Sequence, residues 1–243
     1  MKNFKEFLLT ENRLSYINRI AVIEELAISE SELQKIGEGD NGIAYLYKGK
    51  VLKITADSDE ADFFGQIKGH DFERVANCYD IIEFDFGETE EDNKIYGGYF
   101  MNPRYFWVII KEHLPGDFYD NHWHDIISYY YKYEDRSDFN HTEKDFDKMI
   151  HDYYMETVNA SKEEYGEEYD PEEDDELNHD ISLLNIIKEL HMELNSVGII
   201  SVNDMKTSNM GIKENGEVAF IEVRIAKDKN LPFPQIRQIK MDE

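Results

Sequence analysis

Apolar positions in the first half of the chain recur with the short period of β-strands. Tight turns punctuate them, and the sequence Lys48-Gly49-Lys50 is one such turn. Continuous or alternating apolar residues predict strands at 33–36, 43–47, 51–55, 81–86, 96–101 and 106–110. The first half of the chain is therefore expected to be rich in strands.

Helical periodicity dominates three other stretches. Apolar residues spaced by three and four predict helices over 13–27, 57–68 and 181–194. Asp57 is placed to cap the second of these, and Gly198 follows the third. A small hairpin is expected farther on, with strands at 210–213 and 218–221 across Asn215-Gly216. The pattern therefore predicts both strands and helices along the chain.

Residues 117–180 have a composition of their own, rich in Tyr, His and acidic side chains. Its aromatic parts, 123–133 and 146–154, can form helices that pack on the C-terminal half. Within 163–180, eleven of eighteen residues are Asp or Glu and none is Lys or Arg. This segment has few apolar residues, and their burial cannot offset the conformational entropy that the chain would lose on ordering. We therefore expect 163–180 to be mobile and unnecessary for folding.

The formal net charge of -27 limits the range of partners. Nucleic acids and anionic lipid surfaces are polyanions, so we expect neither direct nucleic-acid binding nor membrane binding. The charge is compatible with basic protein partners, with imitation of DNA, or with solubility alone. The single cysteine, Cys78, allows no intrachain disulfide, and no apolar run is long enough to span a bilayer. A cytoplasmic location is expected.

One candidate phosphate-binding motif lies near the N-terminus. Gly37-Glu38-Gly39-Asp40-Asn41-Gly42 has the spacing G-x-G-x-x-G, and Lys53 follows within an apolar strand. In a dinucleotide-binding fold this turn would open a helix. Here β-branched and aromatic residues follow, so the turn joins two strands. A P-loop is excluded because no G-K-[ST] follows the glycines.

A second motif lies far along the chain. Asp204 is followed by Lys206 and then by Asn209, within Val202-Asn203-Asp204-Met205-Lys206-Thr207-Ser208-Asn209. The order of these features along the chain resembles the protein-kinase-like fold: first the glycine-rich loop, then the lysine in a strand, then the loop with Asp204 and Asn209. The resemblance runs from about Leu33 to about Ala226, apart from 117–180. It implies an α+β, bilobal fold, with an extension over 1–30, an N-lobe over 31–113 and a truncated C-lobe over 114–243.

The resemblance also implies roles for particular residues. Backbone amides of the glycine-rich loop would approach the phosphates of ATP, and the segment 111–116 would be the hinge between lobes. Lys53 would bind the α- and β-phosphates, with Glu60 as its orienting partner in preference to Glu73. The implied nucleotide-binding residues are Gly37, Gly39, Gly42, Lys53, Glu60, Glu112 and Leu114.

The implied transfer chemistry lies in the second motif. Asp204 would accept the proton of the attacking hydroxyl, and Lys206 would stabilise the transferred phosphoryl group. Asn209 and Glu222 would bind magnesium. Glu222 departs from the family pattern, because the thirteenth residue after the loop Asn is normally the Asp of D-F-G. Only 21 residues follow it, which leaves no room for an activation segment.

Two kinds of function remain open. The first is a kinase-like phosphotransferase that uses ATP and magnesium, transfers phosphate or AMP, and acts on a host protein. The second is a non-catalytic protein, either a pseudokinase or an acidic DNA mimic, that blocks a host defence factor. The intact Lys53, Asp204 and Asn209 favour the first, and Glu222 favours the second.

The first eleven residues, MKNFKEFLLTE, have a further resemblance. Phe4, Phe7 and Leu8 share one helical face, and Leu9-Thr10-Glu11 fits a Leu/Ile-x-Glu cleavage site. The segment resembles the capsid-targeting peptides of internal head proteins in T-even-like tailed phages. It implies a phage protein packaged in the head and delivered to the host cytoplasm. The alternative is an ordinary amphipathic helix.

Overall fold

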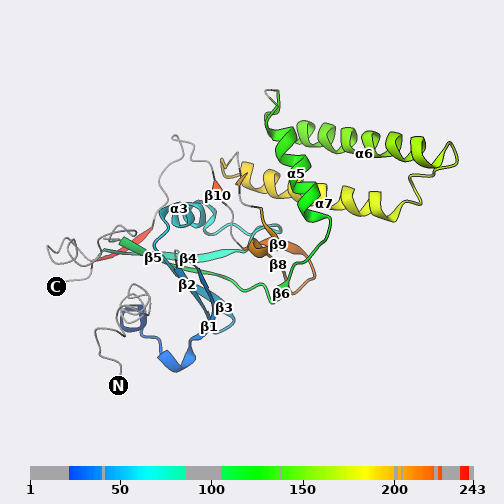
Figure 1. Ribbon diagram of the computed structural model, residues 1–243. Helices are drawn as coiled ribbons and strands as arrows, with labels where there is room; N and C mark the ends of the chain where they lie inside the picture. The colour runs from blue at the N-terminus through cyan, green and yellow to red at the C-terminus, as the bar shows by residue number, and fades with distance from the viewer. Residues whose placement is uncertain are drawn as a thin grey trace, which may run out of the picture. The chain divides into compact units, whose positions relative to one another are not determined.

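The computed structural model describes residues 22–39, 42–85, 105–136, 138–199, 202–203, 205–221, 224–225 and 236–240. The capsid-targeting segment 1–11, most of the predicted helix 13–27 and the predicted strand 96–101 lie outside these residues. The described chain is an α+β protein that divides into two compact units (Figure 1). The first unit takes in the described residues up to 71, those between 77 and 113 and the strand near the C-terminus. The second takes in 72–76 and the described residues between 114 and 225.

Among the described residues of the first unit, six strands form one sheet, and the 3-10 helix η1 (Glu30–Glu32) precedes them in the chain. The strands are β1 (Gln34–Gly39), β2 (Gly42–Tyr47), β3 (Lys50–Thr55), β4 (Cys78–Asp85), β5 (Tyr105–Glu112) and β11 (Arg237–Lys240). They lie in the order β1-β2-β3-β5-β4-β11, and only β11 runs parallel to its neighbour. The turn between β2 and β3 uses positive φ at Lys48 (49°) and Gly49 (76°), so the tight turn predicted there is confirmed.

Both faces of this sheet are covered, and alternation along each strand decides which side chain faces which way. Helix α3 (Ser58–Ile67) packs on one face and buries Phe63, Phe64 and Ile67. Asp57 caps it by accepting the backbone N–H groups of Asp59 and Glu60, at 2.9 and 3.2 Å, as the sequence predicts. A second apolar cluster, to which Val22 and Ile28 contribute, contains Leu52 and Ile54 of β3. Lys53 lies between these two and therefore faces α3.

Among its described residues, the second unit contains three α-helices, the short 3-10 helix η2 (Thr207–Asn209) and two small sheets. The helices are α5 (Trp123–Glu134), α6 (Glu143–Tyr165) and α7 (Asp175–Asn195). The three-stranded sheet has the order β6-β8-β9, from β6 (Gly116–Asp117), β8 (Met210–Ile212) and β9 (Val218–Phe220). The two-stranded sheet pairs β7 (Val202–Asn203) with β10 (Arg224–Ile225). The predicted helices and the β8–β9 hairpin are confirmed, and α6 and α7 are longer than predicted.

Helix α5 is held to α7 by two histidine–aspartate contacts that cross. His122 Nδ1 lies 2.7 Å from Asp180 Oδ1, and His179 Nε2 lies 2.7 Å from Asp120 Oδ2. The hydrogen bond to Asp180 raises the pKa of His122. Tyr153 of α6 donates to the other oxygen of Asp180 at 2.5 Å, so this carboxylate joins all three helices.

The expectation that 163–180 is mobile is wrong, because helices occupy both of its ends. Helix α6 continues to Tyr165 and α7 begins at Asp175, with Leu177 and Asp180 buried in the second unit. The Tyr169 hydroxyl donates to Asp174, the N-cap of α7, at 2.5 Å. Composition averaged over eighteen residues hides two inward-facing positions among many exposed acidic ones.

One replacement and one deletion should separate the packed part of this segment from the exposed part. Replacing 167–173 by a Gly/Ser linker of equal length should change the melting temperature little, because these residues lie in the turn between α6 and α7. Deleting 163–180 should lower it by about 10 °C or more, because Leu177 and the Asp180 contacts are lost. Thermal unfolding followed by circular dichroism measures both. Equal melting temperatures for the two variants would contradict the packing of α7 seen here.

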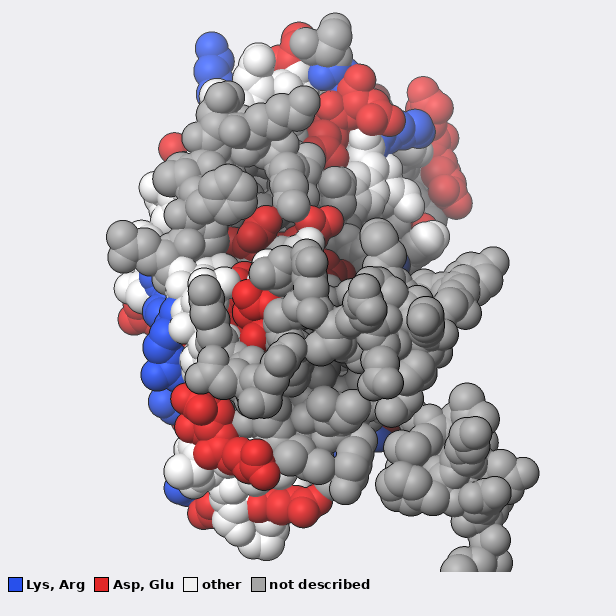
Figure 2. Space-filling view, turned by 90° about the vertical axis from the view of Figure 1, so that its left-hand side faces the viewer, with Lys and Arg blue, Asp and Glu red and all other residues white. Residues whose placement is uncertain are grey.

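Among the described residues on the face drawn in Figure 2, acidic side chains occupy several separate places. Many acidic side chains are expected at the surface, because the whole chain has 53 Asp and Glu residues and only 26 Lys and Arg residues. Among the described residues, no helix is both long and apolar enough to cross a membrane.

Candidate functional site

The glycines of the G-x-G-x-x-G motif border the turn between β1 and β2, and they differ in what surrounds them. Gly39 pairs with Gly42 across the two strands, so the motif joins a hairpin as predicted. A Cβ on Gly42 would lie 2.2 Å from the Ile54 carbonyl oxygen, so the approach of β3 requires glycine there. A Cβ on Gly37 would meet nothing within 4 Å. The packing of the sheet therefore explains Gly42 and leaves Gly37 unexplained.

Lys53 of β3 and Glu60 of α3 form an ion pair, with Nζ 2.7 Å from Oε1. The Glu60 side chain is 3% exposed and that of Lys53 is 17% exposed. The pair joins the sheet to the helix that packs on it, and it is the pair expected from the sequence. Whether these two residues hold a nucleotide stays a prediction.

Sequence reasoning missed a second lysine beside this pair. Lys111 of β5 places Nζ 3.9 Å from the same Glu60 oxygen, and its side chain is 1% exposed. Its ammonium also lies 4.3 Å from the centre of the Phe64 ring. In the sequence Lys111 falls in the segment read as a hinge, but strand pairing sets it opposite Val51 and two residues from Ile109, the partner of Lys53. That register puts Lys53 and Lys111 on the same face, and only cross-strand pairing could have revealed it.

The other two residues expected at the hinge lie at the end of β5 and just beyond it. Glu112 and Asn77 form two hydrogen bonds. The Asn77 backbone N–H donates to Glu112 Oε2 at 3.1 Å. The Glu112 N–H donates to the Asn77 carbonyl at 2.8 Å. Leu114 belongs to the second unit and packs against Gly211 of β8. Their assignment to a nucleotide stays a prediction.

Thiol chemistry and a clustered metal site find no support in the described residues. Burial raises the pKa of Cys78 to about 12, so its thiol stays protonated at neutral pH. No group of three or more His, Cys, Asp or Glu side chains among the described residues is placed to hold a metal ion. The expected magnesium ligand Glu222 lies outside the described residues, so the magnesium site stays a prediction.

The loop that carries the second motif is anchored by strand pairing on one side and by a side chain on the other. Val202 and Asn203 pair with Ile225 and Arg224, which brings the residues just before Asp204 beside those just after Val223. The buried indole of Trp123 donates from Nε1 to the Met205 carbonyl at 2.9 Å. Asp204 itself lies outside the described residues. The residues on either side of it are thus fixed by β10 and by α5.

Lys206 and Asn209 lie at the two ends of the 3-10 helix η2, just before β8. The Lys206 side chain is exposed, and its carbonyl accepts the Asn209 N–H at 2.9 Å. The Asn209 carbonyl accepts the Ile221 N–H at 2.7 Å, which extends the β8–β9 pairing by one step. Asn209 therefore lies beside the residue that precedes Glu222 in the chain.

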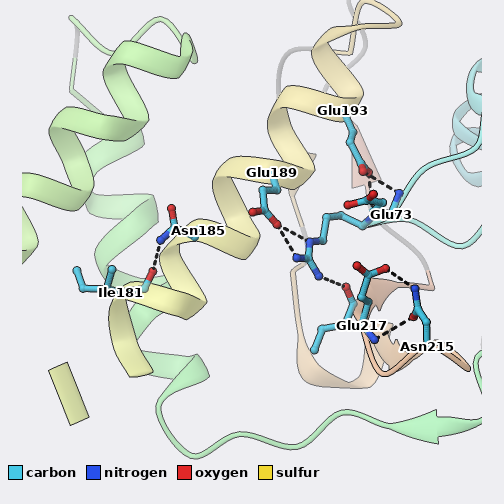
Figure 3. Close-up of polar contacts among 9 residues, drawn as sticks. Glu73, Ile181, Asn185, Glu189, Glu193, Asn215 and Glu217 are labelled. Atoms are coloured by element: carbon cyan, nitrogen blue, oxygen red, sulfur yellow. Dashed lines mark hydrogen bonds and ion pairs between the residues drawn. The ribbon is translucent and has the colours of Figure 1, made fainter. Parts of the chain in front are cut away.

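A short segment after α3, residues 72–76, is fastened within the second unit by contacts that the sequence did not reveal (Figure 3). The Glu193 carboxylate of α7 accepts the backbone N–H groups of Glu73 and Arg74, at 2.7 and 2.9 Å. Arg74 donates to Glu189 Oε2 at 2.6 Å and to the Val218 carbonyl at 3.1 Å. Burial raises the pKa of Glu193. These contacts make Glu73 part of a structural anchor, whereas Glu60 is the ion-pair partner of Lys53.

Comparison with known proteins gives little beyond this geometry. No protein-family model matches the chain, and no curated protein matches it. One solved structure that it is similar to is a thermostable mutant of an aminoglycoside phosphotransferase in ternary complex with ADP and hygromycin B. The sequence identity is 14% and the TM-score is 0.25, over 47% of this chain and 36% of that chain. The match thus spans about a third of that structure, and at this TM-score the likeness carries no argument about function.

Proposed function

We propose that the protein is a kinase-like phosphotransferase that uses ATP and magnesium, on a bilobal fold with a short C-lobe. The observation that carries the proposal is the ion pair between the partly exposed Lys53 and the buried Glu60. A lysine on the third strand, oriented by a carboxylate on the following helix, presents a fixed ammonium group to the phosphates of a nucleotide. The glycine-rich turn borders the strand next to β3, and Gly37 has the open space that a backbone approach to phosphate needs.

The residues of the second motif would carry the transfer itself. Asp204 would accept the proton of the acceptor hydroxyl, and the exposed Lys206 would neutralise charge on the phosphoryl group as it moves. Asn209 and Glu222 would hold magnesium. When bound, the metal would neutralise charge that develops on the phosphates.

Nucleotide binding is tested by thermal shift with ATP and magnesium. A ligand that binds only the folded state at about 100 times its dissociation constant adds about 2.7 kcal/mol of stability, so the melting temperature should rise by several degrees. Lys53→Met should fold and lose this rise. Lys50→Met is the matched control, because Lys50 is an exposed lysine of the same strand and should leave the rise intact. A wild-type protein that shows no rise at millimolar ATP would exclude the proposed enzyme.

The glycine-rich turn offers a second, independent prediction. Gly37→Ala should leave the melting temperature of the free protein unchanged and weaken ATP binding, because a methyl group would occupy the space left for a phosphate. Gly42→Ala should instead destabilise the free protein by about 1–3 kcal/mol, because its Cβ would collide with the β3 backbone. Calorimetric titration and thermal unfolding of both variants give the comparison. Undiminished ATP affinity in Gly37→Ala would remove this turn from the binding site.

A non-catalytic binding protein is the second candidate, and Glu222 is the observation that favours it. Its side chain is one methylene longer than the aspartate expected at that position, which shifts a metal ligand that transfer requires. Under this alternative the acidic protein binds a host factor and blocks it. Mass spectrometry measures the transfer of phosphate or AMP to protein. A wild-type protein that binds ATP but transfers neither group would favour the non-catalytic binding protein over the enzyme.

We also propose that the protein acts in the host cytoplasm after packaging in a phage head. This proposal rests on residues 1–11 alone, with their Leu9-Thr10-Glu11 site. N-terminal sequencing of the protein from purified virions should then show Asn12 as the first residue. Full-length protein found only in infected cytosol would contradict packaging.

A further inference from the structure

Lys111 is a charged side chain in a position that packing alone would fill with an apolar one. It is among the largest fully buried side chains of the described residues. Burial of an ammonium group costs several kcal/mol unless an opposite charge lies close to it. A methionine would fill a similar volume without that cost. A lysine at this place therefore needs an explanation beyond the packing of the sheet.

The carboxylate of Glu60 lies between two lysines that differ in exposure. Lys53 Nζ is 2.7 Å from Oε1 and Lys111 Nζ is 3.9 Å from the same oxygen. Lys111 is 1% exposed and Lys53 is 17% exposed, so Lys111 approaches Glu60 from the buried side. The contact with the Phe64 ring also favours a cation at this place.

We propose that Lys111 is a positioning residue that neutralises Glu60 from the buried side, so that Lys53 remains available to an anionic phosphate. The proposal rests on the proposed function of Lys53 as a phosphate ligand. If Glu60 were balanced by Lys53 alone, the approach of a phosphate to Lys53 would compete with that ion pair. With Lys111 present, Lys53 keeps its orientation from Glu60 and offers its charge to the ligand. The three side chains together carry one more positive charge than negative.

The stability of the free protein tests the shared carboxylate without any ligand. Glu60→Gln should lower the melting temperature by about 10 °C, because it leaves the buried Lys111 ammonium without this counter-charge. Adding Lys111→Met to Glu60→Gln should restore most of the loss. Adding Lys53→Met instead should not, because Lys53 can turn toward solvent. Rescue by Lys53→Met and not by Lys111→Met would overturn the proposal.

Affinity for ATP with magnesium tests the effect on the ligand. Lys111→Met should raise the dissociation constant about tenfold, because it removes one positive charge near the phosphate ligand. The melting temperature of the free variant should stay the same or rise, since an apolar side chain replaces a buried charge. A loss of affinity without a loss of stability is not expected of a merely structural residue. Ile110→Met, one residue away on the opposite face of the strand, is the control and should bind as the wild type does.

Two failures are distinguishable in these experiments. Wild-type protein that binds no ATP would overturn the proposed function and with it the effect of Lys111 on a ligand, whatever the stability rescue shows. Wild-type protein that binds ATP, together with Lys111→Met of equal affinity, would overturn the role of Lys111 and leave the proposed function standing.

Discussion

Trp123→Ala is expected to destabilise the second unit by about 3–5 kcal/mol, which is among the largest losses that a single substitution causes. The indole is 2% exposed, and it packs against the rings of Phe118 and Phe220, with centroids 5.5 and 6.1 Å away. Its removal would leave a cavity lined by α5, β9 and the loop that follows β7. Thermal unfolding should show a fall of about 10 °C or more.

Two further variants separate the two contributions of this side chain. Trp123→Phe keeps an aromatic ring but removes the N–H that donates to the Met205 carbonyl, so it should cost about 1–3 kcal/mol. Tyr119→Ala, at an 82% exposed aromatic residue four positions earlier, should change stability by less than about 0.5 kcal/mol. If Trp123→Ala were as stable as Tyr119→Ala, the buried indole would not hold this unit together.

Trp123→Phe also bears on the proposed chemistry. Met205 directly follows Asp204, so the indole fixes one side of the residue that would accept the proton. Loss of that hydrogen bond should slow transfer more than it weakens ATP binding, because the residues proposed to bind the nucleotide are elsewhere in the chain. Steady-state rates and titrations on one preparation would show the difference.

The sequence predicted the strands and helices well where apolar periodicity was strong. Strands β2, β3 and β5, helix α3 and the β8–β9 hairpin all lie within a few residues of their predicted places. In each case a local signal determines the element. Strands follow from alternating buried and exposed positions, and helix α3 begins after a capping aspartate, so a few neighbouring residues are enough. Strand β11 was missed, because Arg237 and Gln238 are exposed and four residues at a sheet edge carry little pattern.

Contacts between residues that are far apart in the chain could not be predicted from the sequence. The Lys53–Glu60 pair was predictable from the order of strand and helix. Lys111 was not, because its place beside Glu60 depends on the register between β3 and β5. Arg74 was missed for a related reason: its partners Glu189 and Val218 lie more than a hundred residues away in the chain. The acidic stretch 163–180 was misread because average composition outweighed the burial of Leu177 and Asp180.

Asp204→Asn is expected to reduce transfer from ATP by about 10²–10⁴-fold, the usual contribution of a general base. Asparagine has nearly the same shape as aspartate but cannot accept the proton of an attacking hydroxyl. Binding of ATP should survive, because Lys53 and Glu60 are unchanged, so the thermal shift with ATP and magnesium should persist. Release of ADP, with water as the acceptor, and the mass of phosphate or AMP added to protein measure the loss.

The same pair of measurements distinguishes the two candidate functions. Lys206→Ala serves as a second variant of the motif and should also slow transfer, because it removes positive charge where the phosphoryl group would pass. If Asp204→Asn and wild type transferred at the same measurable rate, Asp204 would not be the base and the assignment of this loop would be wrong. If wild type bound ATP and transferred nothing, neither variant would change the outcome, and Glu222 would explain why a nucleotide is held without being used. The enzyme proposal therefore requires a measurable rate of transfer in the wild type. Asp204→Asn should reduce that rate while ATP still binds, and Lys53→Met should abolish it because ATP no longer binds.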